Sequence, residues 1–521
     1  MARVLVTEKL AERGLEVMAE AGHQVDVQLD LTPEGLLQAV VGAQALVIRS
    51  ATNVTDEVLA AGTELVVVGR AGIGLDNVDT EAATRRGVMV VNAPESNILS
   101  AAEHAMGLML ALARNIPQAH AALVAGRWER SKWEGVELHG KTLGVVGLGR
   151  IGALVAQRAL AFGMRLCAYD PYVSPERART MGVELLPLDE LVAEADFLTI
   201  HLPRTAETKG LIARDLLAKV RPGLRIVNAA RGGILDEEAL ADAIASGQVA
   251  GAALDVFATE PCTDSPLFAL PGVVVTPHLG ASTAEAQDKA GVTIGEQVVL
   301  ALAGDFVPFA VNVAAAEVSE TVRPYLGLAE QLGRSLACLH DGMPDRLEVE
   351  YQGGLAGANT AILTLAVLKG LFAAGTEEPV SYVNAPQLAA ERGLEIREVS
   401  ASTARDFVNL ITVRSDQHAL AGTLAGTRAE PRFVMVDDHT VEVPPAEHML
   451  VVRNDDRPGM IGVVGAALGA AGVSISSMAV GPARTGNTAL MVLSTDRTIA
   501  DETVAVLQQS DGILDVHRIG I

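Results

Sequence analysis

Short apolar runs alternate with amphipathic segments over the first 93 residues. The runs are RVLVTE, HQVDVQL, ALVIRS, LVVVGRAG and VMVVNAP, and they are rich in valine, leucine and isoleucine. Apolar strands separated by helical segments predict a parallel sheet covered by helices. We therefore expect a flavodoxin-like α/β lobe at 1–94, followed by a long helical stretch at 95–125 that is rich in alanine, leucine and methionine.

A second series of apolar runs begins at residue 142 and consists of GVVGL, LCAYD, FLTIHLP, LRIVNAA, GAALDVF and VVVTPH. This pattern predicts a second α/β domain, a Rossmann domain that spans 95–284. Residues 284–303 predict a helix that crosses back onto the first lobe, which residues 285–313 would complete. Two such lobes leave a cleft between them at the carboxyl ends of their strands.

The remaining pattern predicts two further domains. Residues 314–445 form an expected α+β domain, with helices early (325–339 and 359–374) and strand-like runs later, and we interpret it as a spacer or regulatory domain. The last segment, 446–521, has the order strand–helix–strand–strand–helix–strand, which is the βαββαβ order of a ferredoxin-like fold.

The segment GLGRIG, which follows a β-branched strand, carries the first chemical signal. Gly147 permits a tight turn from strand to helix, Gly149 lets a pyrophosphate approach the backbone, and Gly152 lets the helix pack on its strand. The helix N-terminus supplies free N–H groups to the phosphates. Asp170, at the end of the next strand, can accept from a ribose diol and would repel a 2′-phosphate. The spacing predicts a dinucleotide site that favours NAD over NADP.

Composition limits the class of protein. The 521 residues are 49% hydrophobic and carry a net charge of −24, which argues against nucleic acid as a partner because such proteins need a basic face. No apolar run reaches the roughly 18 residues of a membrane span, and no signal peptide is evident, so we expect a cytoplasmic protein. Three widely spaced cysteines predict neither disulfides nor a metal site. An anionic substrate would need locally clustered arginines.

Three patches at predicted strand ends carry catalytic residue types. Arg231 in NAARGG can grip a carboxylate and polarise a neighbouring carbonyl. Asp255 and Glu260 are the acids of LDVFATEP, and His278 follows the last strand. Glu260 and His278 could pair as orienter and base. The alternatives are an ordinary loop histidine and a surface arginine paired with Asp236 or Glu237.

Together these residues resemble the D-isomer-specific 2-hydroxyacid dehydrogenases from residue 1 to about 313. The motifs that carry the resemblance are VIRSATNVT, VGRAGIGLDNVD, NAPESNILSAAEH, GVVGLGRIG, HLPRTAETKGLI, NAARGG, LDVFATEP and TPHLGAST. The rest of the chain resembles the intervening domain and the C-terminal ACT domain that the long members of this family carry in actinobacteria and animals. The resemblance covers essentially the whole chain.

The resemblance implies roles for individual residues. Arg231, Glu260 and His278 would be catalytic, and Asp255 would lie near the nicotinamide carboxamide. The implied NAD contacts are Gly147, Gly149, Arg150, Ile151, Gly152, Asp170, Pro203, Ala229, Ala230, Asp255 and Gly280. The implied activity is NAD-dependent oxidation of D-3-phosphoglycerate to 3-phosphohydroxypyruvate, the first step of L-serine biosynthesis, by a homotetramer.

Two other functions stay open at this point. One is a broader D-2-hydroxyacid dehydrogenase or hydroxypyruvate reductase. The other is a redox-sensing binding protein that reads NAD and binds peptides. The complete set of Arg231, Glu260 and His278 argues against a pure sensor, which would not need all three.

The substrate phosphate has two candidate clusters of positive charge. Arg49 and Arg70 follow strands of the first lobe and are expected to point into the cleft, with Gly72 beside them. Arg130 and Lys132, interleaved with tryptophans, are expected between the lobes. The alternative for this second cluster is a solvated loop or a subunit contact.

The ACT resemblance implies an amino-acid effector at the loop after its first strand. The expected contacts are Asn454, Asp456 and Ser474, with the ammonium group of L-serine on Asp456. Serine-sensing members place asparagine where this chain has Ser474, so the alternative is an ACT domain that serves only for dimerisation.

Overall fold

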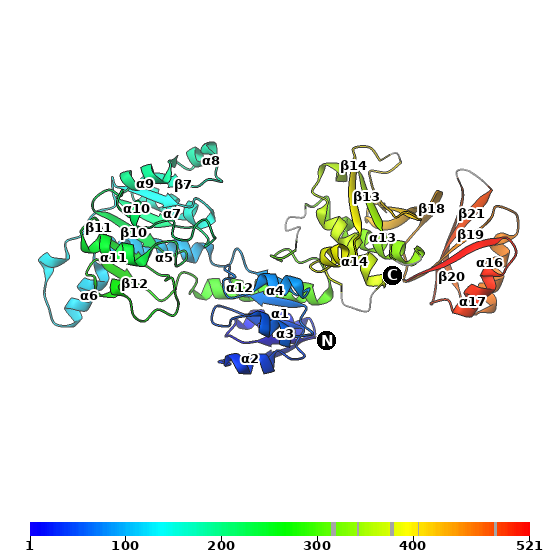
Figure 1. Ribbon diagram of the computed structural model, residues 1–521, viewed down its shortest axis with the longest axis horizontal. Helices are drawn as coiled ribbons and strands as arrows, with labels where there is room; N and C mark the ends of the chain where they lie inside the picture. The colour runs from blue at the N-terminus through cyan, green and yellow to red at the C-terminus, as the bar shows by residue number, and fades with distance from the viewer. Residues whose placement is uncertain (314–318, 341–342, 376–379, 405, 484–486, 521) are drawn as a thin grey trace.

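The computed structural model describes residues 1–313, 319–340, 343–375, 380–404, 406–483 and 487–520. The expected domain boundary at 314 and the chain end at 521 lie outside the described residues. The molecule is elongated (Figure 1): the α/β domain with a seven-stranded sheet lies at one end, the α/β lobe with a five-stranded sheet lies in the middle, and two further units lie at the other end.

The first lobe is a five-stranded parallel sheet with the order β2-β1-β3-β4-β5, as the flavodoxin-like interpretation predicts. Its strands are β1 (Arg3–Val6), β2 (Gln24–Val27), β3 (Ala45–Ile48), β4 (Val67–Arg70) and β5 (Met89–Asn92), and its helices are α1 (Glu12–Glu20), α2 (Pro33–Ala39), α3 (Asp56–Ala61) and α4 (Thr80–Arg85). The strand order reverses between β1 and β3, and such a switch point opens a crevice beyond the carboxyl ends of the strands.

The second domain is a seven-stranded parallel sheet with the Rossmann order β12-β11-β10-β9-β6-β7-β8. Its strands are β6 (Thr142–Val146), β7 (Arg165–Tyr169), β8 (Glu184–Leu185), β9 (Phe197–Ile200), β10 (Leu224–Asn228), β11 (Val249–Leu254) and β12 (Val273–Val275). Its helices are α7 (Arg150–Ala161), α8 (Pro175–Thr180), α9 (Leu188–Glu194), α10 (Arg214–Leu217) and α11 (Glu237–Ala245), with the 3₁₀ turn η2 (Pro266–Ala269).

Long helices connect the two lobes. The helix α12 (Ala284–Ala303) spans the residues that the sequence predicts, and it packs on α1 of the first lobe. The stretch at 95–125, expected as one helical segment, is two helices, α5 (Ile98–Ala113) and α6 (Ile116–Val124). The break falls at Asn115, which has a left-handed φ of 54° and precedes the first turn of α6, where Pro117 lies.

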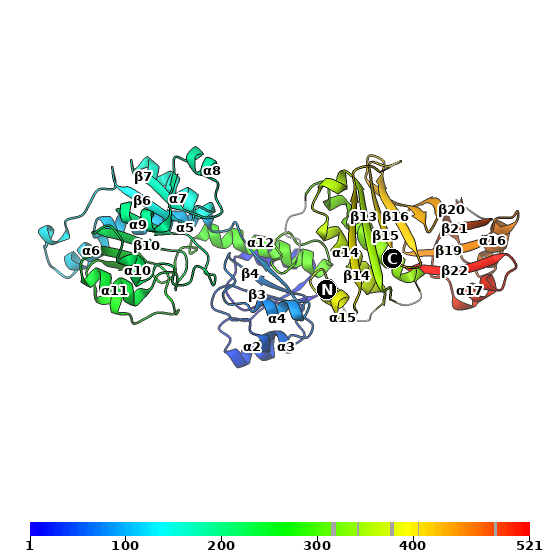
Figure 2. The ribbon, with the colours of Figure 1, turned by 45° about the horizontal axis from the view of Figure 1, so that its top comes forward.

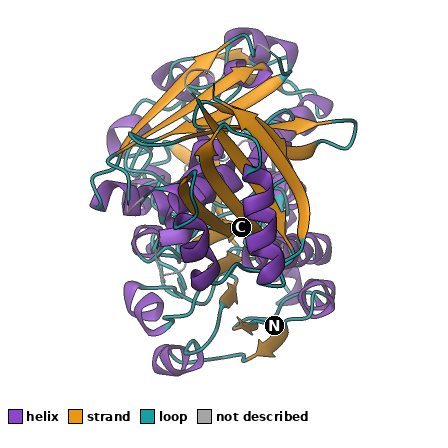
Figure 3. Ribbon diagram, turned by 90° about the vertical axis from the view of Figure 1, so that its right-hand side faces the viewer, coloured by secondary structure: helices purple, strands orange, loops and turns teal. Residues whose placement is uncertain are grey.

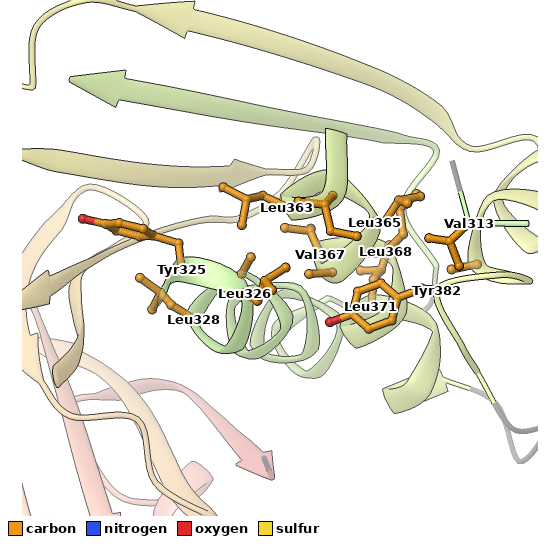
Figure 4. Close-up of a cluster of buried hydrophobic side chains, with 14 of the residues drawn as sticks. Val313, Tyr325, Leu326, Leu328, Leu363, Leu365, Val367, Leu368, Leu371 and Tyr382 are labelled. Atoms are coloured by element: carbon orange, nitrogen blue, oxygen red, sulfur yellow. The ribbon is translucent and has the colours of Figure 1, made fainter. Parts of the chain in front are cut away.

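The third unit packs two helices on a six-stranded sheet with the order β14-β13-β15-β16-β17-β18. Its elements are η3 (Arg323–Tyr325), α13 (Leu326–Leu339), β13 (Arg346–Gly353), η4 (Gly354–Gly357), α14 (Ala361–Gly375), α15 (Ala385–Glu391), β14 (Glu395–Ala401), β15 (Asn409–Arg414), β16 (Ala419–Ala425), β17 (Glu430–Val436) and β18 (His439–Val443). Leucines and valines of α13 and α14 fill the space between the helices (Figure 4). Gly333 lets α13 and α14 approach closely because it has no side chain. A Cβ at this position would lie only 2.0 Å from the Val367 carbonyl oxygen.

The last unit is the expected βαββαβ fold, with an antiparallel sheet of order β20-β21-β19-β22. It consists of β19 (His448–Asp455), α16 (Met460–Ala470), β20 (Ile475–Pro482), β21 (Thr488–Thr495), α17 (Asp501–Gln508) and β22 (Ile513–Gly520). The view from this end of the molecule shows helices in front of the strands (Figure 3). None of the helices in the described ranges is long and apolar enough to cross a membrane.

Candidate active site

The glycine-rich loop between β6 and α7 has the geometry that its sequence predicts. Gly147 has a φ of 96°, a left-handed conformation that disfavours residues with a side chain. A Cβ at Gly152 would lie 2.0 Å from the carbonyl oxygen of Gly147, so only glycine lets α7 pack this close. Gly149 precedes the first turn of α7 and would meet no atom within 4 Å if it carried a Cβ. Free N–H groups therefore border an open space, which fits a pyrophosphate.

Every expected dinucleotide contact follows a strand of this sheet. Because parallel strands end at the same edge, these residues share one rim of the domain. Gly147, Gly149, Arg150, Ile151 and Gly152 follow β6, Asp170 follows β7, Pro203 follows β9, Ala229 and Ala230 follow β10, Asp255 follows β11, and Gly280 follows β12.

Asp170 is tied to the glycine-rich loop. Its Oδ2 accepts a hydrogen bond from the amide of Leu148 at 2.8 Å, and its Oδ1 accepts from the amide of Tyr172 at 2.9 Å. The carboxylate therefore lies directly beside the loop. Arg150, on the other side of the loop, forms an exposed ion pair with Glu95 at 3.0 Å.

Asp255 lies beneath the turn that carries His278. Its carboxylate accepts hydrogen bonds from Thr276 Oγ1 at 2.6 Å and from the amides of Leu279 and Gly280 at 2.7 and 2.8 Å, and His104 Nε2 lies 3.1 Å away. Burial raises the pKa of Asp255, but these hydrogen bonds outweigh it and hold the pKa below its usual value. Because the residue is fully buried, the structure shows it shaping the turn rather than facing the opening.

Glu260 and His278 form the expected pair, with Glu260 Oε2 2.7 Å from His278 Nδ1. Glu260 also accepts a hydrogen bond from the amide of Phe257 at 3.0 Å. Burial raises the pKa of Glu260, but the hydrogen bonds from His278 and Phe257 hold it below its usual value, so the carboxylate stays ionised at neutral pH. An ionised carboxylate can only accept, so the ring proton lies on Nδ1 and Nε2 keeps a lone pair.

A cavity of about 770 Å³ lies between the lobes. It is lined by the first basic cluster and by the pair formed by Glu260 and His278. The first lobe contributes Arg49, Arg70 and Gly72, and the second contributes Glu260 and His278. The structure therefore brings together five residues that the sequence places far apart, at the cleft where the strand ends of both lobes meet.

Arg70 is a partly buried cation that lines this cavity. Burial lowers the pKa of Arg70 to about 10, and the positive charge of Arg231 contributes in the same direction. Because this pKa is still well above 7, Arg70 is charged at neutral pH. Its Nε atom is buried and has no hydrogen-bond partner. A buried donor without a partner is costly, and an anion in the cavity would supply one.

Arg49 is held by its own loop. The Glu8 carboxylate accepts hydrogen bonds from the amides of Arg49, Ala51 and Thr52 at 2.8, 3.1 and 3.0 Å, which fixes the turn after β3. The guanidinium group donates to the carbonyl of Lys9 at 3.1 Å. Burial raises the pKa of Glu8, but these hydrogen bonds outweigh burial and hold the pKa below its usual value.

Arg231 pairs with neither of the carboxylates considered from the sequence. Its Nε lies 3.1 Å from Asp76 Oδ2 of the first lobe, and its Nη1 donates to the carbonyl of Ala230 at 2.7 Å. Asp236 instead caps α11, and Glu237 accepts from the amide of Ala258.

The second basic cluster does not line the cavity between the lobes of its own chain, so its assignment to the substrate phosphate stays a prediction. Arg130 and Lys132 belong to the 3₁₀ turn η1 (Arg130–Trp133) and do not line the cavity. The preceding helix α6 lies at the end of the molecule farthest from the last unit, which consists of β19 to β22 (Figure 2). Lys132 lies 3.9 Å from Glu129, which offsets its charge.

The three expected effector residues do not lie together within one chain. Asn454 and Asp456 are at the end of β19, whereas Ser474 precedes β20 and donates its amide to Asp496. Both β19 and β20 are antiparallel to β21, so α16 returns the chain to the end where β19 began. At 3.3 Å per residue, the two ends of β19 are about 20 Å apart. One small ligand cannot contact both ends of a single domain.

Several cavity residues were missed by the sequence analysis. Asn97 lines the cavity, and its Oδ1 atom is buried without a hydrogen-bond partner. Ser96 and Lys9 also line the cavity. Asn97 and Ser96 lie within the NAPESNILS motif, which was the only signal for them. Among the described residues, no group of histidine, cysteine, aspartate or glutamate side chains is arranged to hold a metal ion.

Three family descriptions match successive parts of the chain. The NAD-binding domain of D-isomer-specific 2-hydroxyacid dehydrogenases matches residues 106–280, the intervening domain of D-3-phosphoglycerate dehydrogenase matches 321–437, and the ACT domain matches 448–512. Each range falls within one of the domains expected from the sequence.

Individual proteins resemble the chain over most of their length. The D-3-phosphoglycerate dehydrogenase of Mycobacterium tuberculosis is 51% identical over 96% of this chain and 95% of its own. The D-3-phosphoglycerate dehydrogenase of Methanocaldococcus jannaschii is 42% identical over the whole of both chains. The crystal structure of D-lactate dehydrogenase from Aquifex aeolicus, in complex with NAD and lactic acid, is 26% identical over 58% of this chain and 96% of its own, with a TM-score of 0.52.

Proposed function

The chain belongs to the D-3-phosphoglycerate dehydrogenases of the D-isomer-specific 2-hydroxyacid dehydrogenase family, and on this premise we propose that the cleft oxidises D-3-phosphoglycerate to 3-phosphohydroxypyruvate with NAD⁺. This reaction opens the route to L-serine. The observation that supports the proposal most is the cavity that combines the His278–Glu260 pair with Arg49 and Arg70. A base is thus present with two cations that suit a phosphate.

His278 is the proposed base. Its Nε2 accepts the proton of the substrate C2 hydroxyl, and Glu260 stabilises the imidazolium that forms, through the 2.7 Å contact at Nδ1. Arg231 binds the substrate carboxylate and stabilises negative charge that develops on the C2 oxygen. Arg49 and Arg70 bind the phosphate at the other end of the substrate.

The glycine-rich loop and the N-terminus of α7 are the proposed site of the dinucleotide pyrophosphate, because the space at Gly149 is open and bordered by N–H groups. Bound there, the dinucleotide would supply the nicotinamide as acceptor for the hydride that leaves C2. Asp170, fixed beside the loop, supports a preference for NAD over NADP because its carboxylate repels a 2′-phosphate. The remaining proposed dinucleotide contacts lie on the same rim of the sheet.

Steady-state formation of NADH tests the proposal. With the keto product trapped, we expect kcat/KM for D-3-phosphoglycerate to exceed that for D-glycerate and D-lactate by about 100-fold, because a phosphate on paired arginines supplies charge-assisted contacts of about 1.5–3 kcal/mol each. Equal values for all three acids would instead favour the broader D-2-hydroxyacid dehydrogenase. NADH binding without turnover in either direction would favour the redox sensor.

Replacing Glu260 by glutamine tests the pairing with His278. We expect kcat/KM to fall by about 10- to 100-fold, because the neutral amide stabilises the imidazolium less than a carboxylate does. The same change favours the neutral ring, so the acidic limb of the pH profile of kcat/KM should move to lower pH. An unchanged acidic limb would contradict the proposed role of Glu260.

The ACT domain supports an amino-acid effector, and we propose L-serine, with its ammonium group at Asp456 in the loop after β19. Since Ser474 lies at the other end of the sheet, a site that uses both residues requires two copies of the domain. This geometry agrees with the proposed homotetramer. Addition of L-serine to the NADH assay tests the effector directly.

A further inference from the structure

Asp76 connects the two lobes through ion pairs with the second domain. It lies in the turn that follows β4 of the first lobe, yet its carboxylate contacts two arginines of the second domain. Asp76 Oδ2 is 3.1 Å from Arg231 Nε, and Asp76 Oδ1 is 3.8 Å from Arg204 Nη2. Arg231 follows β10 and Arg204 follows β9, so one carboxylate spans the cleft to two loops.

The turn around Asp76 is shaped to the guanidinium group of Arg231. A Cβ at Gly74 would lie 2.3 Å from Arg231 Nη2, so a side chain at this position would push the guanidinium group aside. The carbonyl of Ala230 accepts from Arg231 Nη1 at 2.7 Å. Arg231 is therefore held by one contact from each lobe, which fixes the plane of the guanidinium and leaves N–H groups on Nη1 and Nη2 for a ligand.

Asp76 also offsets the repulsion between two positively charged side chains, Arg70 and Arg231. Arg70 and Arg231 are close enough for the positive charge of Arg231 to lower the pKa of Arg70, and Asp76 acts on Arg70 in the opposite direction. Without the negative charge of Asp76, the repulsion between the two guanidinium groups would be stronger. Repulsion would move the Arg231 side chain, which is only 28% exposed, away from its position beside Asp76.

We infer that Asp76 is a positioning residue that aligns Arg231 for the substrate carboxylate from across the cleft. The alignment depends on both lobes, so the site is complete only when the first lobe lies against the second domain. The inference rests on the proposed function, because it takes Arg231 as the group that binds the substrate carboxylate. Asp76 itself touches neither the reacting carbon nor the base.

Replacing Asp76 by asparagine should lower kcat/KM for D-3-phosphoglycerate by about 10- to 100-fold, because a small displacement of an orienting group costs that much in rate. The affinity for NADH, measured by fluorescence titration, should stay within about twofold of the original, since the glycine-rich loop is untouched. Asp76→Glu keeps the charge and should retain several times more activity than Asp76→Asn. The matched control is Asp56→Asn, which removes a carboxylate paired with Arg85 and Arg86 on the outside of the same lobe and should leave kcat/KM unchanged.

A double-mutant cycle separates positioning from a merely structural role. In single-turnover reduction of 3-phosphohydroxypyruvate, the loss caused by Asp76→Asn should shrink to less than about twofold when Arg231 is already alanine, because the residue then has nothing to align. Equal losses in both backgrounds, an unchanged rate, or a faster rate from a released Arg231 would each overturn the inference. Failure of the unaltered protein to oxidise D-3-phosphoglycerate would instead overturn the proposed function.

Discussion

Replacement of His278 by asparagine is expected to lower kcat for oxidation of D-3-phosphoglycerate by about 10²- to 10⁴-fold, the usual contribution of a general base. The His278–Glu260 contact at 2.7 Å leaves Nε2 as the free nitrogen of the ring, and the pair lines the cavity between the lobes. Asparagine keeps a polar side chain of similar length but cannot take up a proton at neutral pH. The rate of hydride transfer, measured by stopped-flow absorbance of NADH, reports the loss directly.

Two controls distinguish loss of the base from loss of the fold. The affinity for NADH should be nearly unchanged in His278→Asn, because the substitution keeps the backbone of the turn that includes Gly280 and the glycine-rich loop follows another strand, β6. His23→Asn changes a histidine that precedes β2, at the end of the strands away from the cavity, and should leave kcat unchanged. A loss smaller than tenfold in hydride transfer for His278→Asn would mean that another group takes the proton.

Removal of either cavity arginine should change substrate preference more than it changes catalysis. We expect Arg49→Ala and Arg70→Ala each to lower kcat/KM for D-3-phosphoglycerate by about 10- to 150-fold, which corresponds to a charged hydrogen bond of about 1.5–3 kcal/mol. The net charge of −24 makes a phosphate dependent on such local cations. For D-glycerate, which lacks the phosphate, the same variants should lose less than about threefold.

The test of the phosphate assignment is the ratio of kcat/KM for D-3-phosphoglycerate to kcat/KM for D-glycerate, measured in each variant. Arg70 is partly buried and interacts electrostatically with Glu8 and Asp76, so its removal could also disturb the loops. Arg70→Lys, which keeps the charge, is therefore the second variant and should retain part of the preference. Arg130→Ala is the matched control, since this arginine lies outside the cavity of its own chain. Equal losses for phosphorylated and unphosphorylated acids would contradict the assignment of Arg49 and Arg70 to the phosphate.

Patterns that are local in the sequence predicted the corresponding parts of the structure well. The glycine-rich loop depends on a turn, a helix N-terminus and a close backbone approach within six residues, so its geometry follows from Gly147, Gly149 and Gly152. The helix at Ala284–Ala303 and the βαββαβ order likewise follow from periodicity alone. The break between α5 and α6 was missed, because helical periodicity hides a change of direction at Asn115.

The site residues that do not meet in one chain follow segments whose direction the local pattern does not specify. Arg130 and Lys132 follow α6, which lies at the far end of the molecule, and their charges do not indicate that direction (Figure 2). Asp456 and Ser474 lie at opposite ends of one sheet because a parallel crossover through α16 separates them. The expected effector site therefore requires paired domains.

The sequence by itself determined the strand and helix order, the turn of the glycine-rich loop and the pairing of Glu260 with His278, because each rests on residue type and short spacing. Only the tertiary structure decided which charges meet. Asp76 and Arg231 are 155 positions apart, and Arg70 lies beside them through the packing of two lobes. Contacts across a cleft depend on how two folded sheets are placed against each other, and no local pattern of residues specifies that placement.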